Sequence, residues 1–176
     1  MDHTFFIGIA GAIVLVCGAA FPSRPVRHPR YSLKNWLFAI GGLLMLAYSS
    51  LNFLAGGPIF FVILQLFVNL ASVLMMLNTK DRFDATVLSL GAIGFVAWSL
   101  ALYQGASTIL FILGLTGIGL GYAFKAGTIR RDASLAAGSV LIALFSYLGQ
   151  SWIFFWLNVF FAGFSLLYVW KGLRKN

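Results

Sequence analysis

The feature that most constrains this chain is a series of long apolar runs, most of them about 18 residues or longer, that recur from one end to the other. Wound into a helix, such a run can cross the ~30 Å hydrocarbon core of a bilayer. Hydrophobic residues make up 61% of the 176 residues and charged residues only 9%, whereas about a quarter of residues are charged in soluble domains. The sequence therefore predicts an all-α polytopic membrane protein whose residues 1–176 form a single transmembrane domain.

Short polar or glycine- and proline-containing breaks divide the runs into seven predicted helices. Glycines on two of these helices, Gly8, Gly11 and Gly18 on one and four between 114 and 121 on another, predict close helix contacts. The polar break Arg130–Asp132 is interpreted as a solvated turn. The predicted helices cover about 5–21, 35–53, 58–78, 85–103, 107–125, 133–149 and 152–170.

The positive charges follow the same division. All 12 lysines and arginines lie in alternate gaps between the predicted helices. Loops rich in Lys and Arg stay on the cytoplasmic side of a membrane, so the N-terminus is predicted outside and the C-terminus inside. The net charge of +8 is thus explained by topology and by contact with membrane lipids, and no nucleic-acid partner is expected. The clusters are 24–34, 80–82, 125–131 and 171–175.

Internal matches indicate parallel repeats. Aligning Gly41 with Gly91 without gaps superposes the second and third predicted helices on the fourth and fifth. Residues 103–113 similarly match 147–157. The chain therefore reads as three copies of one helical hairpin in the same orientation. A second, compatible grouping has two parallel three-helix units, joined by the fourth helix as an inverting linker.

A polar stripe marks the third helix. Gln65, Asn69 and Ser72 are spaced so that they stack along one helical face. Superposing Gln65 on Asn158 of the seventh helix also pairs Ser72 with Ser165. Amides in hydrocarbon need partners, so the two stripes predict a central site lined from two sides. Hydrogen bonding between helices, without any ligand, is the alternative explanation.

The sequence lacks the residues that several kinds of chemistry require. The chain has no Glu, and its four aspartates, 2, 81, 84 and 132, all fall at or beyond the ends of predicted helices. Ionisable groups inside the membrane are the usual sign of proton relays and ion coupling. Cys17 is the only cysteine, so no disulfide framework or thiol metal site is expected. We expect no catalytic residues, no metal and no cofactor, and hence no enzyme.

The predicted arrangement of three helices, a linker helix and three more resembles the SWEET sugar facilitators, the PnuC vitamin transporters and, more loosely, the PQ-loop proteins. It is also similar to small seven-helix bacterial inner-membrane proteins. The resemblance covers nearly the whole chain and implies a midplane substrate site with polar contacts from Gln65, Asn69 and Asn158. Trp98 and Trp156 would be stacking partners for the substrate. The chain departs from these families in lacking a Pro-Gln motif and prolines within its helices.

These features together predict a facilitator in a bacterial inner membrane for a neutral or zwitterionic small solute, sugar-like or vitamin-like, working by alternating access. Gln65, Asn69, Ser72, Asn158, Ser165, Trp98 and Trp156 are the expected substrate-binding residues. The alternative is a non-catalytic subunit or assembly factor of a larger membrane complex. Either function is compatible with homo-oligomers.

Overall fold

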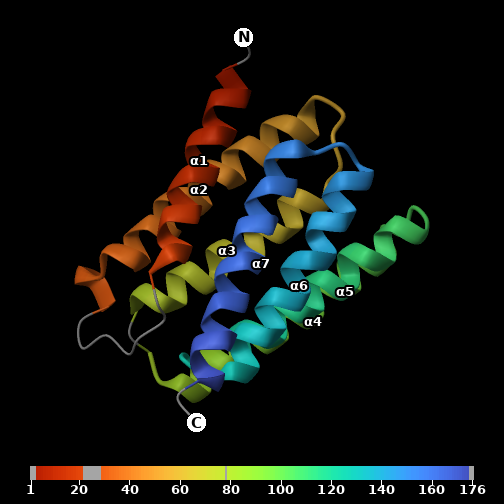
Figure 1. Cartoon of the computed structure of the whole chain (residues 1–176). Coiled ribbons are helices and arrows are strands. Elements are labelled where there is room, and N and C mark those ends of the chain that lie inside the picture. Colours follow the sequence, from red (N-terminus) through yellow and green to blue (C-terminus); the bar gives the residue numbers. More distant parts are fainter. Residues whose placement is uncertain (1–2, 22–28, 78, 175–176) are drawn as a thin grey trace. The chain divides into compact units, whose positions relative to one another are not determined.

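The computed structural model describes residues 3–21, 29–77 and 79–174, and these residues form seven α helices, one short 3-10 turn and no strand. Each of the seven helices is long and apolar enough to cross a bilayer, which confirms the predicted all-α membrane fold. Figure 1 follows the chain from red to blue through α1 (His3–Ala20), η1 (Pro29–Tyr31), α2 (Leu33–Leu54), α3 (Phe60–Leu77), α4 (Asp81–Ala101), α5 (Ala106–Ala123), α6 (Ile129–Leu148) and α7 (Trp152–Leu173).

Two helices begin about one turn earlier than the sequence predicts. α4 begins at Asp81 and α6 at Ile129, and each follows a residue with extended backbone, Lys80 or Thr128. The Thr128 hydroxyl accepts a hydrogen bond from the backbone N–H of Arg131, at 3.4 Å, and so caps α6. The polar residues that the sequence indicates as a turn thus form the first turn of each helix.

The interpretation of Arg130–Asp132 as a solvated turn is wrong for two of its three residues. Arg131 and Asp132 lie in the first turn of α6 and are each only 9% exposed. The end of α7 covers this turn, because a Cβ built on Gly172 would lie 2.8 Å from Cγ1 of Ile129. Arg130, the residue before Arg131, is exposed. The helices packed beside this turn are α5, at Tyr122 for Arg131, and α7, at Gly172 for Ile129.

The chain divides into two compact units, one with α1 to α3 and one with α4 to α7. In the first unit, α2 packs against both α1 and α3. The backbones of α1 and α2 come close at two glycines: a Cβ on Gly11 would lie 3.0 Å from the backbone nitrogen of Met45, and one on Gly41 would lie 2.8 Å from that of Leu15. The predicted packing role of Gly11 is confirmed, and Gly18 likewise faces Phe38 of α2.

In the second unit, α6 packs against both α5 and α7, while α4 packs against α5. α5 and α6 also approach through glycines. A Cβ on Gly117 would lie 2.9 Å from the Cα of Gly138, and a Cβ on Gly138 would lie 2.6 Å from the backbone nitrogen of Ile118. Gly114 and Gly121 also meet α6, which confirms close packing for three of the four α5 glycines.

The internal packing of the two units is alike where the predicted triplets align. In α1–α3 and in α5–α7 the middle helix contacts both neighbours, and its contact with the first helix is made at glycines. Each predicted hairpin, α2–α3, α4–α5 and α6–α7, also consists of two helices that pack on each other. The outside position of the N-terminus and the single transmembrane domain stay predictions.

Candidate functional site

Gln65 lies on α3, roughly one and a half turns from its first residue. Its side chain is 1% exposed. Its carbonyl oxygen Oε1 is buried and receives no hydrogen bond from any residue that the structure describes. Leaving a buried acceptor without a donor costs about 1–3 kcal/mol. Gln65 therefore contributes an acceptor that the fold itself does not use.

Asn69, one turn further along α3, joins this helix to α2. Its Nδ2 donates to the backbone carbonyl oxygens of Gly42 on α2, at 3.0 Å, and of Gln65, at 2.7 Å. A Cβ on Gly42 would lie 3.0 Å from Oδ1 of Asn69, so the glycine makes room for the amide. The structure brings Gln65 and Asn69 together, and both protons of the Asn69 amide are directed at backbone carbonyls.

Ser72 completes the polar face of α3 and is 2% exposed. Its hydroxyl donates to the carbonyl of Val68 in the same helix, at 2.8 Å. A second asparagine at this helix pair was missed by the sequence reasoning: Nδ2 of Asn35 on α2 donates to the carbonyl oxygen of Met75 on α3, at 3.1 Å. The signal for it in the sequence is an amide in the first turn of a mostly apolar helix.

The matching face of α7 lies in the second unit. Asn158 is 5% exposed and sits less than two turns into its helix, so its position in α7 is close to that of Gln65 in α3. Its Nδ2 donates to the carbonyl of Phe154, one turn earlier, at 2.8 Å. Ser165, two turns further on, is also buried. The polar groups of α7 thus face protein within their own unit.

The two tryptophans lie at the surface of the second unit. Trp98 of α4 is 41% exposed and stacks on Phe95, with ring centroids 6.4 Å apart. Trp156 of α7 is 55% exposed and meets Phe155 edge-on at 5.1 Å. Both rings pack against neighbours on their own helices.

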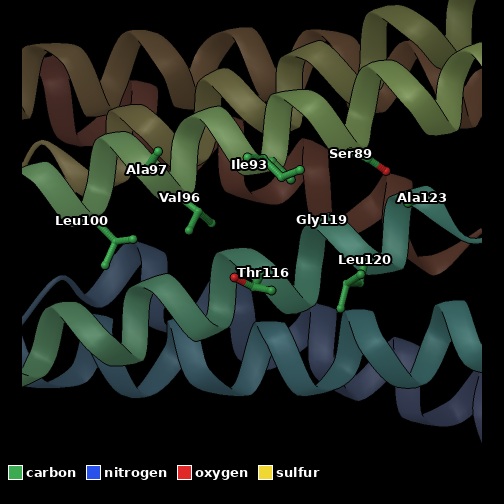
Figure 2. Close-up of a pocket in the computed structure, with 10 residues that line it drawn as sticks. Ser89, Ile93, Val96, Ala97, Leu100, Thr116, Gly119, Leu120 and Ala123 are labelled. Atoms are coloured by element: carbon green, nitrogen blue, oxygen red, sulfur yellow. The ribbon is translucent and has the colours of Figure 1, made fainter.

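A groove between α4 and α5 is a feature that the sequence reasoning missed. It has a volume of about 370 Å³ and an almost entirely apolar lining. Figure 2 shows Ser89 and Ala123 near one end of the groove and Leu100 at the other. The Thr116 hydroxyl in its wall already donates to the carbonyl of Ile112, at 2.8 Å. Small residues on both helices, Gly119 among them, leave the space open.

The described residues contain no group of three or more His, Cys, Asp or Glu side chains that could hold a metal ion. Cys17 is exposed and forms no disulfide.

Comparison with protein-family models, with curated proteins and with solved structures gives no match.

Proposed function

We propose that this integral membrane protein is a facilitator for a small neutral or zwitterionic solute, with Gln65 on the polar face of α3 as a solute-binding residue. The observation that carries the proposal is the unpartnered Oε1 of Gln65, in a side chain that is 1% exposed. The nearby Asn69 amide donates to Gly42 and Gln65 carbonyls instead. Burying this oxygen is unfavourable while it lacks a donor, and a ligand that donates a hydrogen bond to it would remove that cost.

The chemistry of the face indicates the kind of solute. Gln65 offers a neutral acceptor, and the solute would therefore present a hydroxyl or N–H donor, as sugars and vitamin-like compounds do. An isolated charge would need a counter-charge at depth, and α3 carries no charged residue. Asn158 occupies a similar position in α7, a helix of the same predicted orientation, and its part in solute binding stays a prediction.

Uptake into proteoliposomes tests this proposal. The purified chain would be reconstituted and offered a panel of radiolabelled neutral sugars, nucleoside-type vitamins and zwitterionic amino acids. We expect uptake of one class above that of protein-free vesicles, and its loss in Gln65→Leu. A matched control is Ser146→Ala, which removes a buried hydroxyl of α6 that donates only to Ile142 of its own helix, at 2.7 Å. Unchanged uptake by Gln65→Leu would contradict the proposed site.

A second candidate function, as a subunit of a larger membrane complex, is favoured by the exposed face of α4. Only 11% of the apolar window of this helix is buried, and Leu90 and Ile93 are 64% and 65% exposed. A partner helix could cover this face. In that case the protein would leave native membranes in mild detergent with a stoichiometric partner, and Ile93→Trp would release the partner without unfolding the chain. A monodisperse 19.2 kDa species from native membranes would argue against this function.

A further inference from the structure

One end of the second unit gathers cations from three helices. α5 ends and α6 begins at this end, and the contact between Gly172 and Ile129 places the end of α7 beside them. Five lysines and arginines on or beside α5, α6 and α7 accompany Asp132 here, and Arg82 and Asp84 lie in the first turn of α4. The five cations are Lys125, Arg130, Arg131, Lys171 and Arg174.

Arg131 differs from the other four cations because it is only 9% exposed. Its Nε is buried and donates to no residue that the structure describes. Its guanidinium carbon lies 5.7 Å from the ring centroid of Tyr122, in the last turn of α5. Nε and the adjacent Nη of an arginine form a fork that fits two oxygens of a phosphate. The buried Nε is therefore a donor without an acceptor, at a helix N-terminus that favours negative charge.

Among the described residues at this end, Asp132 and Asp84 carry the carboxylates that would oppose an anion. Asp132 acts electrostatically on Tyr168 of α7, whereas Arg131 lies against Tyr122 of α5. Neighbouring residues in the first turn of α6 thus interact with different helices.

The apolar groove of α4 and α5 ends at this same end of the unit. Ala123, in its lining, is the last residue of α5, and the exposed Lys125 follows two positions later. On α4 the exposed Arg82 lies about two turns before Ser89. From Ser89 to Leu100 the groove follows α4 for roughly 16 Å, by the helical rise. That length is close to one leaflet of a hydrocarbon core of about 30 Å.

We propose that the α4–α7 unit binds an anionic phospholipid. Its phosphate would lie at Arg131 and the first turn of α6, and one acyl chain would fill the α4–α5 groove. The groove supplies an apolar channel of one leaflet's depth, and the cations at its end supply the charge complementarity. Because the acyl chain leaves one apolar environment for another, most of the preference for this lipid would come from the net negative charge of its headgroup. This inference does not depend on the proposed transport function.

Lipid titration of the purified full-length chain in a neutral maltoside detergent tests the phosphate contact. We expect phosphatidylglycerol to bind about tenfold more tightly than phosphatidylcholine, because the choline cation beside the phosphate of phosphatidylcholine would be repelled by the neighbouring lysines and arginines. Arg131→Gln should remove that preference. Arg130→Gln, which removes the same charge from the exposed neighbour, should retain most of it. If Arg131→Gln does not fold, Arg131→Lys keeps the charge but loses the fork, and it should give a smaller loss.

Three outcomes would overturn the proposal. Equal losses in the two glutamine variants would mean that only general surface charge attracts the lipid. Equal affinity for the two lipids would show that the site does not select an anionic headgroup. Inorganic phosphate that displaces phosphatidylglycerol at equal concentration would identify a free anion, not a lipid, as the ligand.

The groove is tested separately with Ala97→Phe, which places a ring in the space that the acyl chain would occupy. We expect this variant to weaken phosphatidylglycerol binding several-fold. The matched control Leu90→Phe adds a ring on the same helix outside the groove lining and should bind the lipid normally. Unchanged binding by Ala97→Phe would overturn the acyl-chain position.

Discussion

The side-chain amide of Asn69 on α3 donates a 3.0 Å hydrogen bond to the backbone carbonyl of Gly42 on α2. The two groups can approach because Gly42 lacks a side chain, and an added Cβ would lie 3.0 Å from Oδ1 of Asn69. Gln65, one turn away, is buried but leaves its Oε1 unused by the described residues. Two amides on one helical face therefore have different roles, one joining helices and the other available to a ligand.

The two amides should respond differently to replacement by leucine. Asn69→Leu removes a hydrogen bond between helices and should lower the free energy of unfolding by about 1–2 kcal/mol. Gln65→Leu removes a buried acceptor that lacks a donor, so stability should be unchanged or slightly raised. Thermal unfolding in detergent measures both. A large destabilisation by Gln65→Leu would show that Gln65 has a structural partner.

Glycine substitutions should distinguish close contacts from open helix surface. Gly138→Ala places a Cβ 2.6 Å from the backbone nitrogen of Ile118, and overpacking of this kind costs about 1–3 kcal/mol. Gly163→Ala on α7 meets nothing within 4 Å, so the higher helix propensity of alanine should leave stability equal or raise it by up to about 1 kcal/mol. Denaturant unfolding of both variants checks this difference, and equal effects would contradict the close α5–α6 contact.

The predicted membrane orientation is open to cysteine labelling in a Cys17→Ala background. Cysteines at Ala55, Ala106 and Gln150 should react with an impermeant thiol reagent added to intact cells. Cysteines at Thr79 and Thr128 should react only after the cells are opened. Ala55 is preferable to Gly56, whose φ of +94° would be strained by any side chain. The reverse labelling pattern would refute the outside position of the N-terminus.

Transport, if it occurs, should be downhill. An ion-coupled carrier needs a group that holds the ion within the membrane, and the described part of α3 and the polar face of α7 offer only neutral side chains. Uptake into proteoliposomes should therefore stop at equal internal and external solute concentrations. Imposed proton or sodium gradients should leave this end point unchanged. Accumulation above equilibrium under either gradient would point to an ion site.

The sequence by itself was sufficient to predict seven membrane-length helices, because apolar length and the positions of Lys, Arg, Gly and Pro are local properties. It also predicted the packing of Gly11 and Gly117, since small residues at helical spacing allow backbones to approach. The polar stripe from Gln65 to Ser72 was visible for the same reason: helical periodicity places these residues on one face.

Only the tertiary structure decided which member of that stripe forms a hydrogen bond to another helix. The acceptor for Asn69 is a backbone carbonyl of α2, 27 positions earlier in the chain, and no local pattern identifies it. Burial of Arg131 was likewise decided by packing, since its guanidinium lies against Tyr122 of α5 while the end of α7 contacts Ile129. Composition and periodicity depend on neighbours in sequence, whereas a hydrogen bond or a buried charge depends on which distant helix packs beside it.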